Sequence, residues 1–157
     1  MKNAENTSLD SVTKDEVIEV KHSIKEWARQ KMVVANLEKN INSLNEQLNI
    51  LETARTSESL SPEAAEMTKE IIEMRIKSLK EVMAGVISNA VDAGLFISTL
   101  EVEERSLICG KYIECMNTVQ LCNKLHVSRA TLFRIQDRAF KKIALMKREK
   151  KVTMGVH

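Results

Sequence analysis

Three arginines near the end of the chain are spaced so that one helix could present them to a nucleic acid. Arg129, Arg134 and Arg138 follow one another at intervals of five and four residues, and all three lie outside the apolar stripe of the predicted helix, on its exposed face. A guanidinium donates paired hydrogen bonds to guanine in the major groove and also binds phosphate. Phe133 falls on the same face, where its ring either packs on a thymine methyl group or folds back over Phe140. This pattern predicts binding to double-stranded DNA.

Two helices with local capping residues would position these arginines. Asn117 and Gln120 form a capping box that starts a short first helix, in which Cys122 is small enough for a close helix crossing. His126 stands at the turn, where a positive φ is expected, and Ser128 caps the second helix. The apolar positions recur at helical spacing on the inward face: Leu121, Leu125, Leu132, Ile135, Ala139 and Ile143. The sequence therefore predicts a helix-turn-helix.

These segments resemble region 4 of the sigma-70 family. Residues 126–143 are similar to its promoter-reading half, in which a valine and a Ser or Thr precede a "TVRRIEERALRKL"-like helix. Residues 100–113 are similar to the opening helix of the family, "L-x-x-x-E-R-x-hydrophobic-hydrophobic-x-x-R-Y". In length and layout the chain also resembles small phage regulators of late genes, the ArpU and RinA type. The resemblance implies that residues 129–145 form a helix that enters the major groove of a promoter element.

The basic face and the resemblance together define the residues expected to bind DNA. They are Ser128, Arg129, Ala130, Thr131, Phe133 and Arg134 at the start of the second helix, Arg138, Lys141 and Lys142 further along it, and Lys124 in the preceding helix. The alternative is a helical hairpin whose basic face is merely solvated, because motif matches include false positives.

The composition of the 157 residues indicates an all-α protein. There are 4 glycines and 1 proline, and aromatic residues make up 3%, so turn-forming and strand-forming residues are scarce. The expected fold is a long N-terminal helical hairpin or coiled-coil module followed by a C-terminal sigma-70 region 4-like helix-turn-helix domain. No uninterrupted apolar run reaches the roughly 20 residues of a membrane span. A cytoplasmic protein of a bacterial host cell, with no membrane partner, is expected.

Residues that could support catalysis or bind a metal are few. Cys109, Cys115 and Cys122 form no C-x-x-C pair, and the 3 histidines are scattered. Structural thiols are expected, and a metal ligand or catalytic thiol is the alternative. The sequence has no glycine-rich phosphate loop. It thus predicts neither an enzyme nor a cofactor.

The charge of the chain changes sign along its length. Residues 1–100 contain 12 basic and 16 acidic residues, a net charge of −4, whereas residues 101–157 contain 12 and 6, a net charge of +6. A basic C-terminal third favours nucleic acid as the partner. For the basic tail, residues 147–157, solvated lysines and phosphate contacts are equally open interpretations.

The first part of the chain predicts two long helices, within a module of residues 13–94 that follows a flexible arm, residues 1–12. Thr13 and Glu16 form a capping box that opens the first helix. Apolar residues then follow a heptad seam that changes phase between Lys31 and Leu37, which predicts a stutter or a bend. The seam comprises Val17, Val20, Ile24, Trp27, Val34, Leu37, Ile41, Leu44, Leu48 and Leu51.

The second long helix is expected from Pro62 to about Asp92. Ser61 would cap it, and Gly94 would end it in a left-handed conformation. Gly85 inside this helix costs about 1 kcal/mol against alanine, and close packing against another backbone would be one reason for tolerating it. A domain boundary is expected after Gly94, before the helix-turn-helix domain of residues 95–146.

Two functions fit these features. The first is a sequence-specific transcription regulator, an activator of phage late (packaging or lysis) genes, in which residues 13–92 self-associate or contact RNA polymerase. Trp27 is the largest seam residue available for a homo-oligomer, and packing within one chain is the alternative. The second function is a DNA-binding assembly protein, such as a small terminase-like subunit that packages phage DNA.

Overall fold

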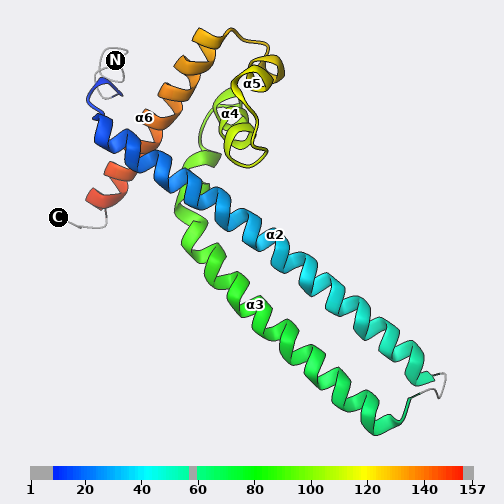
Figure 1. Cartoon of the computed structure of the whole chain (residues 1–157). Helices are drawn as coiled ribbons and strands as arrows, with labels where there is room; N and C mark the ends of the chain where they lie inside the picture. The colour runs from blue at the N-terminus through cyan, green and yellow to red at the C-terminus, as the bar shows by residue number, and fades with distance from the viewer. Residues whose placement is uncertain (1–8, 57–59, 154–157) are drawn as a thin grey trace. The chain divides into compact units, whose positions relative to one another are not determined.

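The computed structural model describes residues 9–56 and 60–153, and it confirms the all-α fold class (Figure 1). Neither described range contains a strand. The helices are α2 (Lys14–Thr56), α3 (Pro62–Ser98), α4 (Val102–Tyr112), α5 (Thr118–Leu125) and α6 (Arg129–Thr153).

The chain forms two compact units that divide it differently from the sequence-based boundary. The α6 unit combines Met1–Arg29 with Ala90–His157, and the hairpin unit is Gln30–Asn89. Helices α2 and α3 therefore each contribute residues to both units. The sequence instead predicts that all of the first long helix belongs to an N-terminal module that ends at residue 94.

The core of the α6 unit joins the first part of α2 to α4, α5 and α6. Val20, Ile24 and Trp27 are at most 4% exposed, and they share one cluster with the buried Leu107 and Phe140. These three α2 residues are thus core residues of the α6 unit and not members of a coiled-coil seam. The predicted inward positions of α5 and α6 lie in the same cluster, with Leu125 partly buried and the others buried: Leu121, Leu132, Ile135, Ala139 and Ile143.

Gly94 packs against Trp27. A Cβ atom at Gly94 would lie 3.4 Å from Trp27 Nε1, at the limit of ordinary van der Waals contact. Helix α3 continues through Gly94 to Ser98, and the predicted end near Asp92 with a left-handed cap is wrong. Close packing does not account for Gly85, because a Cβ atom there would meet nothing within 4 Å.

The hairpin unit packs the rest of α2 against the start of α3. The two segments run antiparallel (Figure 1), and Ile41, Ile72 and Ile76 form the buried centre of their core. Ser61 caps α3 as predicted, since its Oγ accepts a hydrogen bond from the Ala64 N–H at 3.2 Å. The predicted change of seam phase begins directly after the boundary between the units at Arg29 and Gln30, because the two parts of α2 serve different cores.

Helix α3 leaves much of its apolar surface exposed. Met67, Ile71 and Met74 are 65%, 64% and 69% exposed, and Val82 is 54% exposed. By length and composition alone, α3 is also the one described helix that could cross a membrane, with an 18-residue window of mean hydropathy 1.3. This window is not an uninterrupted apolar run, and core helices of soluble proteins meet the same test.

Both predicted terminal segments are partly structured. Of the predicted arm, residues 1–8 lie outside the described residues, while the Val12 N–H donates to the Leu9 carbonyl at 3.2 Å and the Val12 side chain packs on the core. The predicted helix of residues 129–145 extends to Thr153, so most of the basic tail forms the last turns of α6. Residues 154–157 lie outside the described residues.

Candidate nucleic-acid interface

Local hydrogen bonds form α5, the turn and the start of α6 as predicted. The Gln120 N–H donates to Asn117 Oδ1, and the Asn117 N–H donates to Gln120 Oε1, both at 2.9 Å. His126 has φ 56° and ψ 45°, the left-handed conformation expected at the turn. Ser128 Oγ accepts a hydrogen bond from the Thr131 N–H at 3.2 Å. These caps fix the direction in which α6 leaves the turn.

Gly110 allows α4 and α5 to cross closely. A Cβ atom at Gly110 would lie 2.8 Å from Leu121 Cδ2, closer than ordinary packing permits. The sequence predicts a close crossing of α5 and α6 at Cys122, which is partly buried against the core. The turn between these helices also contains Cys115 at φ 55°, a strained conformation that no local sequence signal predicts.

The N-terminal end of α6 carries the exposed group of predicted contact residues. Arg129 and Arg134 are exposed, and neither forms an ion pair among the described residues. The Arg129 guanidinium lies 5.5 Å from the centroid of the Phe133 ring, which is 45% exposed. Ser128 and Ala130 are also exposed and have small side chains, whereas Thr131 is half-buried. A partner could approach the backbone closely here.

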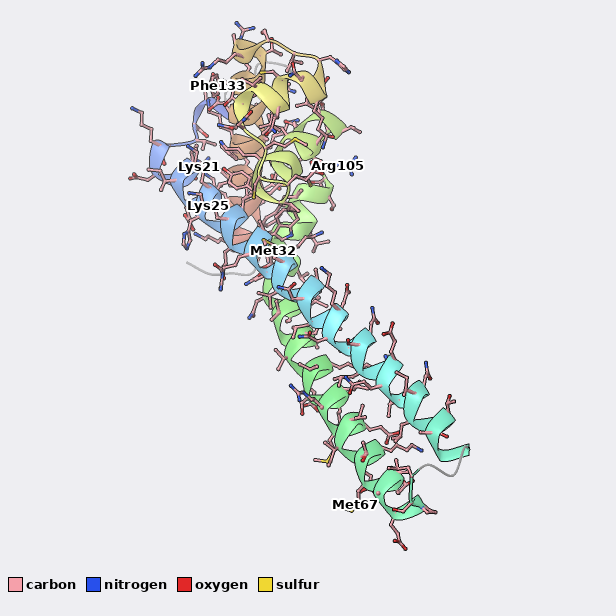
Figure 2. All side chains as sticks on the ribbon, turned by 45° about the vertical axis from the view of Figure 1, so that its right-hand side comes forward. Lys21, Lys25, Met32, Met67, Arg105 and Phe133 are labelled. Atoms are coloured by element: carbon pink, nitrogen blue, oxygen red, sulfur yellow. The ribbon has the colours of Figure 1, made fainter. Side chains whose placement is uncertain are left out.

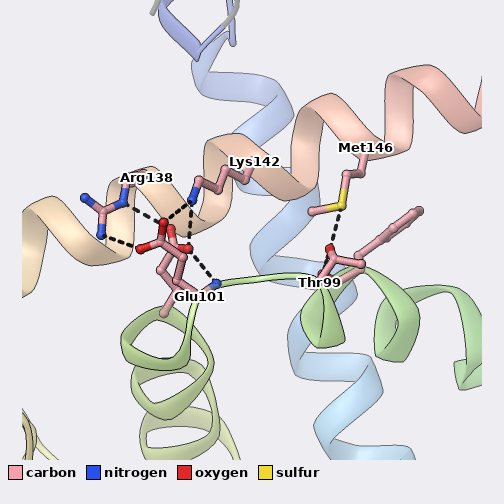
Figure 3. A network of polar contacts seen from close by, with 7 residues as sticks. Thr99, Glu101, Arg138, Lys142 and Met146 are labelled. Carbon is pink, nitrogen blue, oxygen red and sulfur yellow. Dashed lines mark hydrogen bonds and ion pairs between the residues drawn. The ribbon is translucent and has the colours of Figure 1, made fainter. Parts of the chain in front are cut away.

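Further along α6, Arg138 and Lys142 bind a buried carboxylate. Glu104 of α4 is 0% exposed. Its Oε1 accepts from Lys142 Nζ at 2.9 Å and from the Glu101 N–H at 3.0 Å, and its Oε2 accepts from Arg138 Nε at 3.2 Å. Figure 3 shows this network, in which Glu101 adds weaker ion pairs at 3.8 and 3.9 Å.

The network holds Glu104 in its charged form. Burial alone would raise the pKa of Glu104, but the hydrogen bonds from Lys142, the Glu101 N–H and Arg138 outweigh burial and lower it. Arg138 and Lys142 therefore compensate an internal charge, a role that the sequence does not predict. They keep 41% and 30% of their side-chain surface exposed, and their contact with DNA stays a prediction. The two segments that resemble sigma region 4 meet at this carboxylate.

Lys124 and Lys141 also have acidic partners within the chain. Lys124 Nζ lies 3.2 Å from Glu114 Oε2, and Lys141 Nζ lies 2.9 Å from Asp137 Oδ2. Such exposed pairs are weak, because water and salt screen them. Both lysines remain near the surface, but they are less available to an external anion than Arg129 and Arg134.

The basic tail is anchored to acidic residues of the same unit. Arg148 donates to both Glu16 oxygens at 2.6 Å, and this hydrogen bonding lowers the Glu16 pKa to about 2. Lys147 Nζ donates to Ser23 Oγ at 2.8 Å and lies 3.6 Å from Glu19. Lys150 forms an ion pair with Asp92. The three cations hold α6 against α2 and α3, a role that neither interpretation of the tail includes.

A cluster of three lysines lies beside α6 and is absent from the predicted site. The Lys21 Nζ lies 5.6 Å from the centroid of the Phe140 ring, and Lys111 Nζ donates to Gln136 Oε1 at 2.8 Å. Lys25 follows Lys21 by one helical turn on α2 (Figure 2). Burial lowers the pKa of Lys111, and repulsion from Lys21 and Lys25 lowers it further. Only the folding of α2 onto α6 brings these residues together, so no sequence spacing predicts the cluster.

Metal ligands do not converge within the two described ranges. No group of three or more His, Cys, Asp or Glu side chains there is placed to hold a metal ion. Cys109 and Cys122 are partly buried free thiols, and Cys115 is an exposed one.

The part of the chain that includes α4 to α6 is thus helical. Among its described residues, Arg129 and Arg134 are exposed arginines without an acidic partner. Residues 66–144 match the DUF1492 family, described as a protein of unknown function. This match spans half of the chain, and the chain belongs to the DUF1492 family. Neither a curated protein nor a solved structure matches it. The family match contains α4, α5 and the first part of α6, but it excludes α2.

Proposed function

We propose that this protein is a sequence-specific DNA-binding transcription regulator. In this proposal the N-terminal end of α6 enters the major groove of a promoter element, as the resemblance to sigma-70 region 4 implies. The resemblance to ArpU and RinA regulators further suggests an activator of phage late genes that works in the bacterial cytoplasm.

The observation that carries the proposal is the state of Arg129 and Arg134. Both are exposed on the first two turns of α6, and neither has an acidic partner in the described structure. Arginine and guanine form a frequent specific contact through two parallel hydrogen bonds. The small residues Ser128 and Ala130 beside them would let the helix end approach the bases, and Phe133 offers an apolar surface for a thymine methyl group.

Selection of duplexes from a randomised DNA library tests the proposal. The full-length protein should enrich a defined sequence and retain a large preference for it over random DNA at physiological salt. A DNA-binding assembly protein of the small terminase-like kind would bind with strong salt dependence but little sequence preference. Enrichment of no sequence would overturn the regulator in favour of this alternative.

We further propose that the hairpin unit pairs with a second copy of the chain. Met67, Ile71, Met74 and Val82 lie outside the side of α3 that carries the buried Ile72 and Ile76, so packing within the unit leaves them exposed. Trp27 is buried in the α6 unit and no longer supports self-association, which corrects the sequence-based argument. A two-fold dimer would suit a regulator that reads two half-sites.

Sedimentation of the full-length protein at micromolar concentration tests this pairing. The wild-type protein should be a dimer, and Ile71→Gln/Met74→Gln should convert it to a monomer without loss of helicity. A wild-type monomer that binds phospholipid vesicles would assign the α3 face to a membrane instead, whereas a monomer that binds RNA polymerase would assign it to that partner.

A further inference from the structure

One face of helix α6 is exposed near its N-terminal end and covered by α2 further along. Phe133 and Phe140 are seven residues apart, about two turns, and so lie on the same side of the helix. Phe133 is 45% exposed, whereas Phe140 is 1% exposed beneath α2. The first part of α2 therefore begins to cover α6 about 10 Å beyond the ring of Phe133.

The lysine cluster lies at the point where this covering begins. Lys21 of α2 stands over Phe140, and Lys111 of α4 holds Gln136, which lies between the two aromatic positions. Lys25 is exposed one turn beyond Lys21. In the view of Figure 2, Lys21, Lys25 and Phe133 lie along one side of the α6 unit, and Arg105 projects from the other.

Within the described residues, none of these three lysines forms an ion pair with an acidic side chain. Other cations of the same unit, such as Arg138, Lys142 and Arg148, do have acidic partners. The lysines instead repel one another: the pKa of Lys111 is lowered first by burial and further by the charges of Lys21 and Lys25. An anion placed among them would relieve this repulsion.

The spacing suits a DNA backbone. The major groove of B-DNA is about 12 Å wide, so a cation about 10 Å along α6 from a ring inside the groove is level with the bordering phosphates. We infer that Lys21, Lys25 and Lys111 bind backbone phosphates beside the groove that the N-terminal end of α6 enters. This inference rests on the proposed function. It assigns a DNA contact to α2, which lies outside the residues that match the family.

Salt dependence of DNA binding by the full-length protein tests the inference. Lys21→Gln/Lys25→Gln should weaken binding to a random-sequence duplex by about tenfold near 0.1 M salt and lower the slope of log K against log [salt] by about 2. Preference for a duplex selected by the wild-type protein should stay unchanged, because phosphates carry no sequence information. Lys25→Gln alone, at an exposed position, should give about half of the change in slope.

Arg105→Gln/Lys151→Gln is the matched control. It removes two cations from the same unit, one on the other side and one about 27 Å along α6 from Phe133. A wild-type slope in the Lys21→Gln/Lys25→Gln protein, or an equal loss in the control, would overturn the phosphate contact. If the wild-type protein binds DNA without sequence preference, the proposed regulator is wrong. The salt slopes of the variants would then still show whether Lys21 and Lys25 bind phosphates. If it binds no DNA, both fail.

Discussion

The two ends of α6 carry similar positive charge but use it differently. At the N-terminal end, Arg129 and Arg134 are exposed and unpaired in the described structure. From Arg138 onward, most of the cations bind acidic residues of α2, α3 and α4, and Lys141 pairs with Asp137 of α6 itself. A count of basic residues along the helix therefore overstates the surface open to DNA, and the difference can be tested at each end.

The largest effect should come from the buried carboxylate of Glu104. Glu104→Ala removes the acceptor for both Arg138 and Lys142, and we expect a loss of about 3 kcal/mol in the free energy of unfolding. The value is at the low end for a buried pair, because these cations keep 41% and 30% of their side-chain surface exposed. Denaturant unfolding measures it. Asp137→Ala, which removes a surface pair with Lys141, is the control and should change stability by about 0.5 kcal/mol or less. Similar results for both variants would contradict the structural role of Glu104.

Arg134→Ala and Arg138→Ala should change different properties, DNA binding in the first variant and stability in the second. Arg134→Ala should weaken binding to a selected duplex by about 1–3 kcal/mol and relax the preference at one base pair, with stability unchanged. Arg138→Ala should lower stability by about 1–2 kcal/mol, because Glu104 loses one donor, and leave the base preference intact. Paired binding and unfolding measurements check both. If Arg138→Ala alone changes the base preference, the division of α6 into two functional ends is wrong.

Phe133 tests how far the exposed end extends. Because its ring is 45% exposed, Phe133→Ala should leave the melting temperature nearly unchanged. Affinity should fall by about 1 kcal/mol, mainly for duplexes with an A·T pair at one position. Phe133→Leu, which keeps an apolar side chain, should recover part of the loss. A melting temperature lowered by many degrees would instead place the ring in the core.

The smallest effect should come from Glu16 at the other end of the helix. Its pKa is lowered to about 2, first by the hydrogen bond from Arg148. Because the folded-state pKa lies below the ordinary value of 4.5, the stabilisation is complete above that value and is lost as the pH falls toward 2. Thermal melting of the wild-type protein and Glu16→Gln should differ at neutral pH and converge near pH 2. A difference independent of pH would exclude the charge of Glu16 as its cause.

Local features of the sequence were sufficient for the starts of α2, α3, α5 and α6. The caps at Thr13, Ser61, Asn117 and Ser128 involve residues three positions apart, so spacing alone predicts them. The left-handed conformation of His126 is also predicted locally, from its position in the turn between two helices.

Contacts between distant residues could not be predicted in this way. Arg138 binds Glu104 across 34 positions, and Lys111 meets Lys21 only after α2 has folded against α6. A cation on the predicted basic face thus pairs with a buried carboxylate, and two lysines of an acidic segment lie close to Lys111. Apolar spacing in α2 was likewise correct as a pattern, but it does not reveal that Trp27 and Ile41 enter different cores.

The α6 unit is discontinuous in the chain, and this affects how it forms during synthesis. Val20, Ile24 and Trp27 leave the ribosome early, yet the core that buries them requires Phe140, and the Glu16 pair spans 132 positions to reach Arg148. At about 5–20 residues per second, these apolar side chains wait roughly 6–25 seconds for their partners. The hairpin unit is contiguous and can fold first. Once the hairpin unit has folded, the effective chain length between the two distant parts of the α6 unit is shorter. The loop that closes when the α6 unit folds therefore costs less entropy.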